Sequence, residues 1–161
     1  MRYALIVLGI LALWTTSSVA QAQDNRLRGI RQMDLLVESL AKDEDAKKCR
    51  ISDKELSDSF NLTTAALAKF RIVKEAETTA YINPTVLFVN DGMCVYNIQL
   101  QVYSIEDVRV TQSNRIVTAV VELWESSNIG YASPDNLAKE LRTILDRLSK
   151  KLITDWDADN R

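Results

Sequence analysis

The N-terminal end of the chain limits how much of it can enter a folded domain. An unbroken apolar run from Ala4 to Trp14 follows the charge of Arg2, and small and polar residues continue through Thr15 to Gln23. This order is typical of a signal peptide. The run has 11 residues, whereas a transmembrane helix needs about 20. We therefore expect residues 1–22 to be a signal peptide and residues 23–161 to form a single α+β domain.

Two positions fit the small residues that a signal peptidase reads. Ala20-Gln21-Ala22 places cleavage after Ala22, and Ser18-Val19-Ala20 places it after Ala20. An uncleaved membrane anchor is the alternative, but no basic cluster follows the apolar run to stop its transfer. No cysteine precedes Cys49, so an N-terminal lipoprotein anchor is excluded. We expect a periplasmic or secreted protein without a stable membrane anchor after cleavage.

The charge of the expected mature chain restricts its partners. Its 139 residues suffice for one hydrophobic core. They contain 19 basic and 22 acidic residues, a net charge of −3, with no basic patch. Nucleic acids and anionic membranes attract clustered positive charge. We therefore expect no nucleic-acid binding.

Two cysteines, Cys49 and Cys94, belong to this exported chain. An even number outside the reducing cytoplasm predicts one disulfide. Closing a loop of 46 residues would stabilise the fold by about 4 kcal/mol. A metal site or a reactive thiol is the alternative. Neither has support, because the chain has no histidine and no C-x-x-C spacing.

Local patterns predict two helices. Ser52-Asp53-Lys54-Glu55 has the form of a capping box, and apolar residues at helical spacing follow to about Ala68. Ser133-Pro134 supplies an N-cap and a first-turn proline for a second, longer helix. Its apolar stripe consists of Leu137, Leu141, Ile144, Leu145, Leu148, Leu152 and Trp156.

Strand patterns occupy much of the rest. Asn90-Asp91-Gly92 predicts a hairpin with a tight type I′ turn, and Pro84 places the preceding strand at an edge or at a bulge. The strand after the turn alternates, with Cys94, Tyr96, Ile98, Leu100 and Val102 on its buried face. We also predict a strand at 33–40, a charged turn at 42–48, and a strand at 115–125 that ends before a break at 128–130. The expected inner row of the strand at 115–125 is Val117, Ala119, Val121 and Leu123. Residues 23–32, before the first strand, are expected to be a flexible lead-in.

These elements predict an α+β fold in the order β-α-β-β-β-β-α. One antiparallel-rich sheet with both helices packed on one face is the simplest arrangement that buries every apolar stripe.

The absence of histidine removes the Ser-His and Cys-His nucleophile schemes and the common zinc sites. Glu38, Glu122, Glu125 and Glu106-Asp107 offer carboxylates, which we interpret as solvated surface charge. Asp155 to Asn160 begins like a calcium loop, but the chain stops before the glutamate needed at the twelfth position. Acids also oppose the dipole at a helix C-terminus, so we expect fraying there. We expect no enzyme, no catalytic residue, no metal and no cofactor.

Trp124, Tyr131 and Trp156 are the candidate interaction residues. The strand that carries Trp124 leads through a short connection into the helix that ends near Trp156, so these rings could lie close together. One interpretation is that they seal the helix end and a sheet edge. The other is a half-exposed aromatic surface for a protein or a ligand, since aromatic anchors dominate interface energetics.

The chain resembles a recurrent kind of small exported bacterial α+β protein with two cysteines, for which no activity is established. The residues that carry the resemblance are Val37-Glu38-Ser39-Leu40, Cys49-Arg50-Ile51, Phe70-Arg71-Ile72, Cys94-Val95-Tyr96, Leu123-Trp124, Gly130, Asp155-Trp156 and Asn160. They cover nearly all of the expected mature chain. Arg50 departs from the pattern, which has a glycine after the first cysteine. The resemblance implies the disulfide and the α+β sheet, and it implies no activity.

We therefore expect a non-enzymatic periplasmic interaction module. It would bind an unidentified protein or envelope component through an exposed sheet face or edge. The alternative is a domain that binds a small ligand or lipid in a pocket between the C-terminal helix and the sheet.

Overall fold

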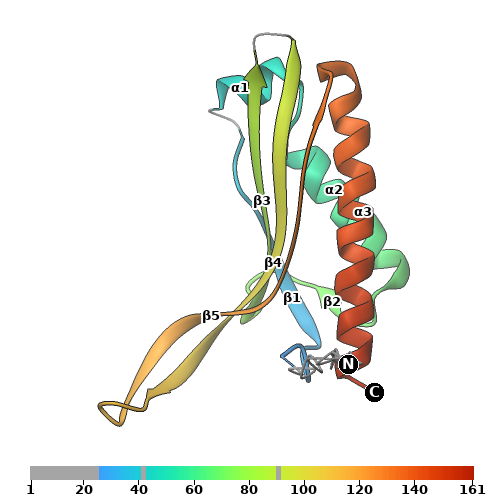
Figure 1. Cartoon of the computed structure of the whole chain (residues 1–161). Helices are drawn as coiled ribbons and strands as arrows, with labels where there is room; N and C mark the ends of the chain where they lie inside the picture. The colour runs from blue at the N-terminus through green and yellow to red at the C-terminus, as the bar shows by residue number, and fades with distance from the viewer. Residues whose placement is uncertain (1–25, 41–42, 90–91) are drawn as a thin grey trace, which may run out of the picture.

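The computed structural model describes residues 26–40, 43–89 and 92–161. The predicted signal peptide lies outside these ranges. The elements, in chain order, are β1 (Gln32–Val37), α1 (Glu44–Lys48), α2 (Asp53–Leu67), β2 (Arg71–Ile72), β3 (Thr78–Val89), β4 (Met93–Val110), β5 (Arg115–Ala132) and α3 (Pro134–Asp159). The strands form one sheet in the order β2-β1-β3-β4-β5, and α2 and α3 cover one of its faces (Figure 1). The predicted α+β fold class is confirmed.

The sheet is mixed but mostly antiparallel. β1 pairs in parallel with β2 and with β3, whereas β3, β4 and β5 form an antiparallel meander. β1 pairs with β3 only as far as Ile82, and the backbone N–H of Glu38 adds a last bond to the Ile82 carbonyl. Pro84 lies two residues further on, where β3 has no neighbour on that side, so the predicted edge position is confirmed.

The hairpin between β3 and β4 differs in detail from the prediction. Val89 pairs with Met93, so three residues connect the strands rather than the two of a type I′ turn. The first two of them lie outside the described residues. Gly92 has φ +71°, a left-handed conformation that suits glycine.

The core lies between the sheet and the two helices. All seven residues of the predicted apolar stripe of α3 are buried, and so are all five of the predicted inner residues of β4. α2 packs beside α3, with Leu56 and Phe60 buried between the layers. Period-two burial in a strand and 3.6-residue periodicity in a helix therefore both predicted the core correctly.

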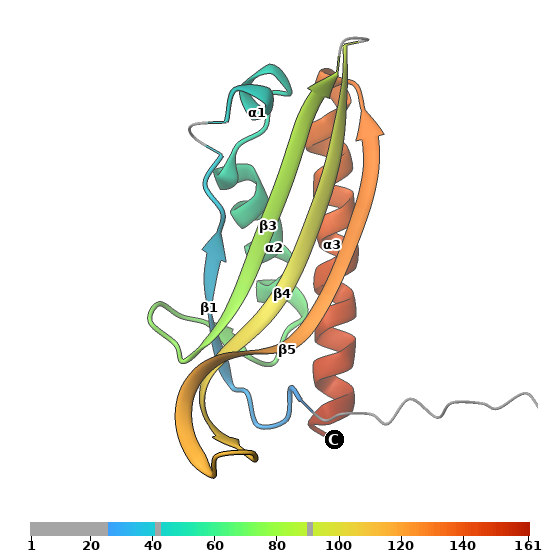
Figure 2. The same cartoon turned by 60° about the vertical axis from the view of Figure 1, so that its left-hand side comes forward.

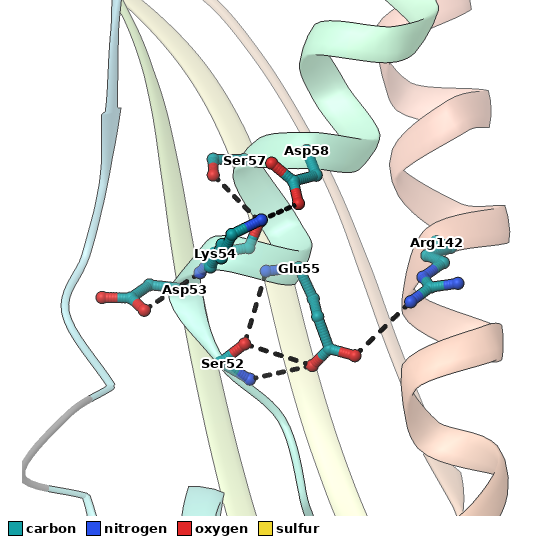
Figure 3. Close-up of polar contacts among 7 residues, drawn as sticks. All are labelled: Ser52, Asp53, Lys54, Glu55, Ser57, Asp58 and Arg142. Atoms are coloured by element: carbon teal, nitrogen blue, oxygen red, sulfur yellow. Dashed lines mark hydrogen bonds and ion pairs between the residues drawn. The ribbon is translucent and has the colours of Figure 1, made fainter.

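The predicted start of α2 is confirmed at the level of single bonds (Figure 3). The Ser52 Oγ accepts a hydrogen bond from the backbone N–H of Glu55, and the Glu55 carboxylate accepts one from the backbone N–H of Ser52. α3 begins differently. Pro134 opens it, but the Ser133 side chain makes no capping bond to the helix backbone and accepts instead from the Asn136 amide.

Cys49 and Cys94 form the predicted disulfide, with their Cα atoms 5.9 Å apart and both residues fully buried. The charged segment before Cys49 is a short helix, α1, rather than the predicted turn. The Asp43 carboxylate accepts from two backbone N–H groups at its start, and acids in its first turn and lysines in its last turn match the helix dipole. Arg50 has φ +56°, a left-handed conformation that glycine adopts more readily than arginine.

The C-terminal end of α3 holds the N-terminal segment, against two predictions. Asp159 accepts a hydrogen bond from the Leu27 N–H at 3.0 Å, and the Asn160 side chain accepts from Gly29 at 2.7 Å and donates to the Leu27 carbonyl at 3.0 Å. Leu27 is buried, so this part of the expected flexible lead-in is fixed. The acids do not fray the helix, because each of them has a donor: Asp155 accepts from Trp124 and Lys151, Asp157 from Lys69 and Asp159 from the Leu27 backbone.

β5 differs from the prediction in its length and in the burial of its side chains. It runs without a break through residues 128–130, and a bulge lies opposite Val102 and Tyr103. Gly130 fits within it because the Tyr96 ring occupies the space above: a Cβ there would lie 2.4 Å from the Tyr96 Oη. Of the expected inner row, Leu123 is half-buried and packs against the core, whereas Val117 is exposed. Beyond Ser104 the β4–β5 hairpin leaves the body of the molecule, as both views show, and no helix covers it (Figures 1 and 2). We call residues 105–120 the arm.

Candidate functional site

One face of the sheet is open. Figure 2 looks onto this outer face, with α2 and α3 behind the sheet. Because side chains alternate along a strand, the outer face carries the odd-numbered residues of β3 and of the body part of β4. The strand register places them in rows across three strands. Leu87, Val95 and Tyr131 form the row nearest the β3–β4 turn, and Thr85, Asn97 and Ile129 form the next.

The first rows make an apolar area near the β3–β4 turn. Tyr131 and Ile129 are each 74% exposed, and Leu87 is 53% exposed. We call Leu87, Val89, Val95, Ile129 and Tyr131 the Tyr131 patch. Large apolar side chains gathered on one exposed surface typically mark a binding site, whereas isolated ones do not. Tyrosine is also one of the residues that carry most of the energy of protein interfaces.

A polar band crosses the middle of the outer face. The Asn83 amide donates to the Gln99 side chain at 3.2 Å, and Gln99 donates to the Glu125 carboxylate at 3.4 Å. One row further, the Gln101 amide donates to the Glu122 carboxylate at 3.1 Å. The band thus joins β3, β4 and β5 by side-chain bonds, which fixes the side chains that a partner would meet.

A shallow hollow lies beyond the band, at the base of the arm. It has a volume of about 290 Å³ and is lined by Leu36, Glu77, Thr79, Tyr81, Tyr103, Ser104, Ile105 and Val120. The Tyr81 and Tyr103 rings lie side by side, with centroids 6.2 Å apart. The Tyr81 hydroxyl donates to the Glu38 carboxylate, and this bond raises the pKa of Tyr81 to about 12. Burial and the nearby Glu122 carboxylate raise the pKa of Tyr103.

Outside the arm, the charged side chains of the outer face are acidic except on β2, where the exposed Arg71 pairs in the strand register with the exposed Gln32 of β1. β1, β3 and the parts of β4 and β5 outside the arm contain no lysine and no arginine. The acidic residues on these strands are Asp34, Glu122 and Glu125, and Glu38 follows directly after β1. Asp34 lies on the outer face because its neighbour Met33 is buried on the other face. A partner with basic side chains around an apolar centre would therefore complement this face.

The structure does not bring the three predicted aromatic residues onto one surface. Tyr131 lies on the outer face, whereas Trp156 is buried on the helix side, packs edge-on against Phe70 and donates to the Ile30 carbonyl at 2.8 Å. Trp124 also faces α3, where its indole N–H donates to the Asp155 carboxylate at 2.7 Å. Both tryptophans therefore join α3 to other elements. The open rows around Tyr131 could be found only from the strand register.

The interface between α3 and the sheet, where the alternative ligand pocket was expected, is occupied by the buried stripe of α3 and the inner residues of β4. Another hollow, of about 500 Å³, lies between α2 and α3 on their solvent side. Its three carboxylates are each paired with a basic side chain: Asp58 with Lys54 at 2.5 Å, Glu55 with Arg142 at 3.4 Å (Figure 3) and Asp146 with Lys150 at 2.7 Å. The Lys150 bond lowers the pKa of Asp146.

Within the described ranges, no group of three or more histidine, cysteine or acidic residues is placed to hold a metal ion. No helix in the same ranges has the length and apolarity that crossing a membrane requires.

Comparison with known proteins leaves the family open. No protein-family model matches the chain, and no curated protein matches it. Among solved structures, the chain is similar to a minor lipoprotein from Acinetobacter baumannii, determined at 2.35 Å. The two are 10% identical, the alignment covers 81% of this chain and 92% of that chain, and the TM-score is 0.35.

Proposed function

We propose that this protein is a non-enzymatic interaction module that acts outside the cytoplasm and binds a protein partner through the outer face of its sheet. The Tyr131 patch is the anchor, and the acidic residues beside it select a partner with basic side chains around an apolar centre. The disulfide supports the location, because such bonds persist in oxidising compartments such as the periplasm and are rare in the cytosol.

One observation carries the proposal. Helices cover one face of the sheet, while the other face keeps Leu87, Ile129 and Tyr131 more than half exposed. Burying such side chains on a partner gains about 25 cal/mol for each Å² of apolar surface removed from water. The polar band around them supplies amides and carboxylates that can hydrogen-bond at the rim of an interface.

Site-specific photocrosslinking tests the proposal. A benzophenone amino acid replaces Tyr131 in the protein expressed with its own leader, and a matched control carries it at Arg142, which is 62% exposed on α3. We expect illumination of intact cells to give an adduct with a second protein at position 131 that is at least tenfold stronger than at position 142.

A second variant tests the chemistry of the contact. Ile129→Asp adds an acid beside the anchor and should reduce the adduct at position 131 at least fivefold, since the partner must then desolvate a charge. High salt should weaken the adduct as well, because exposed charges are screened. Equal labelling at positions 131 and 142, or labelling that Ile129→Asp leaves unchanged, would contradict the proposal.

A further inference from the structure

The arm presents an open strand edge of unusual composition. β5 is the last strand of the sheet on its side, so its outer edge has no strand partner in the part of the chain that the structure describes. Within the arm and its base, Ile116 to Val121 reads Ile-Val-Thr-Ala-Val-Val, without charge, proline or glycine. Ile116 and Val120 are 61% and 69% exposed. Natural proteins usually protect such edges with lysine, proline or a bulge, and here the bulge comes only at Val102 and Tyr103, at the base of the arm.

The arm also has too few strands to be stable by itself. Beyond the last β3 pair, Thr78 with Ser104, it consists of β4 and β5 alone. An isolated two-stranded hairpin is marginally stable in water, and three or more strands are needed for independent stability. Two arms joined along their β5 edges would make four strands.

We propose that this edge binds a second copy of the chain, with the two β5 strands antiparallel about a two-fold axis at Thr118. This self-association uses a different surface from the proposed function and does not depend on it. The axis sets Ile116 opposite Val120 of the second copy, Val117 opposite Ala119, and Thr118 opposite its own equivalent. Apolar and threonine pairs of this kind stabilise antiparallel strands.

The charges that flank the neutral run fix the direction of pairing. Arg115 precedes the run and Glu122 follows it. Antiparallel pairing keeps the two arginines apart and the two glutamates apart, whereas in-register parallel pairing would set like charges side by side.

The same residues fix the register. An axis moved by one residue to Ala119 would place Glu122 opposite Ile116 and bring a charge into the paired run. The axis at Thr118 keeps the paired run free of charge. The five paired residues are far fewer than the 20 to 30 residues per partner of a standard interface. We therefore expect the dimer to be weak.

Cysteine crosslinking tests the axis. Directly opposed residues of antiparallel strands have Cα atoms about 4.5–5.5 Å apart, within the range that a disulfide spans. Thr118→Cys should therefore give a disulfide-linked dimer under mild oxidation. Asp107→Cys is the matched control, because Asp107 is the β4 partner of Thr118 in the same arm. The two Asp107 positions would lie about 14 Å apart, three strand spacings, which a disulfide cannot bridge. We expect at least tenfold more dimer from the Thr118 variant.

Sedimentation of the purified protein gives an independent measurement. The unmodified protein should show a concentration-dependent dimer, and Thr118→Lys, which sets two lysines opposite each other, should raise the dissociation constant at least tenfold. Glu106→Lys should change it by less than about threefold, since Glu106 lies on β4 opposite Ala119, a strand away from the axis. Equal crosslinking at positions 118 and 107, or a monomer at all concentrations up to about 1 mM, would overturn the proposal.

Discussion

Removing the disulfide is the perturbation with the best-defined magnitude. Cys49 and Cys94 are separated by 45 residues in sequence, and the bond between them closes nearly a third of the chain into a loop. The bond restricts the unfolded chain, and the chain-entropy relation for a loop of this length gives about 4 kcal/mol. Since small domains are stable by about 5–15 kcal/mol, we expect the reduced protein to lose a large part of its stability.

Equilibrium urea unfolding with and without a phosphine reductant measures this effect. The reduced wild type keeps both sulfur atoms, so its difference from the oxidised protein isolates the crosslink. Cys49→Ala/Cys94→Ala is the control: it should be as unstable as the reduced wild type or slightly more so, and the reductant should not affect it. The m-value should rise on reduction, because the unfolded chain becomes more extended. A loss below about 1 kcal/mol in the reduced wild type would refute the loop argument.

Four single changes test other contacts. Asn160→Ala removes the bonds that hold the N-terminal turn and should cost about 1–3 kcal/mol in urea unfolding. Ser149→Ala should stabilise by about 1 kcal/mol in the same assay, because its buried Oγ has no hydrogen-bond partner among the described residues. Arg50→Gly should raise the melting temperature, since it relieves a left-handed backbone at a gain of up to about 1 kcal/mol. The pKa of Tyr81, raised to about 12, means that the folded state holds the phenol proton more tightly than the unfolded chain. This contribution is complete below pH 10 and lost as the pH rises toward 12, and Glu38→Gln should lower the pKa seen by ultraviolet titration.

Short-range signals in the sequence predicted much of the fold. The capping box at Ser52 and the alternation from Cys94 to Val102 depend on neighbours within a few residues, and both are confirmed. The disulfide followed from a count and an expected compartment. These features need no knowledge of what packs against them.

The parts that sequence reasoning missed depend on distant partners. The alternation around Val117 identified two faces of a strand, but only the structure could reveal that α3 does not reach the arm, so neither face is covered. The acids at the end of α3 were interpreted against the helix dipole alone. Their donors are remote in sequence: Lys69 is 88 residues from Asp157, and the Leu27 amide is 132 residues from Asp159. The Tyr131 patch likewise required the register of three strands.

The bonds of Asp159 and Asn160 to the N-terminal turn bring the two ends of the domain together, at the end of the molecule away from the β3–β4 turn (Figure 1). The first and last described residues of the domain therefore lie close together in space. A few residues of linker would suffice to connect position 161 to position 26, and new ends could be opened at the β3–β4 turn without cutting a helix. Such a circularly permuted chain would keep every core contact, and it would place a fused reporter directly beside the Tyr131 patch.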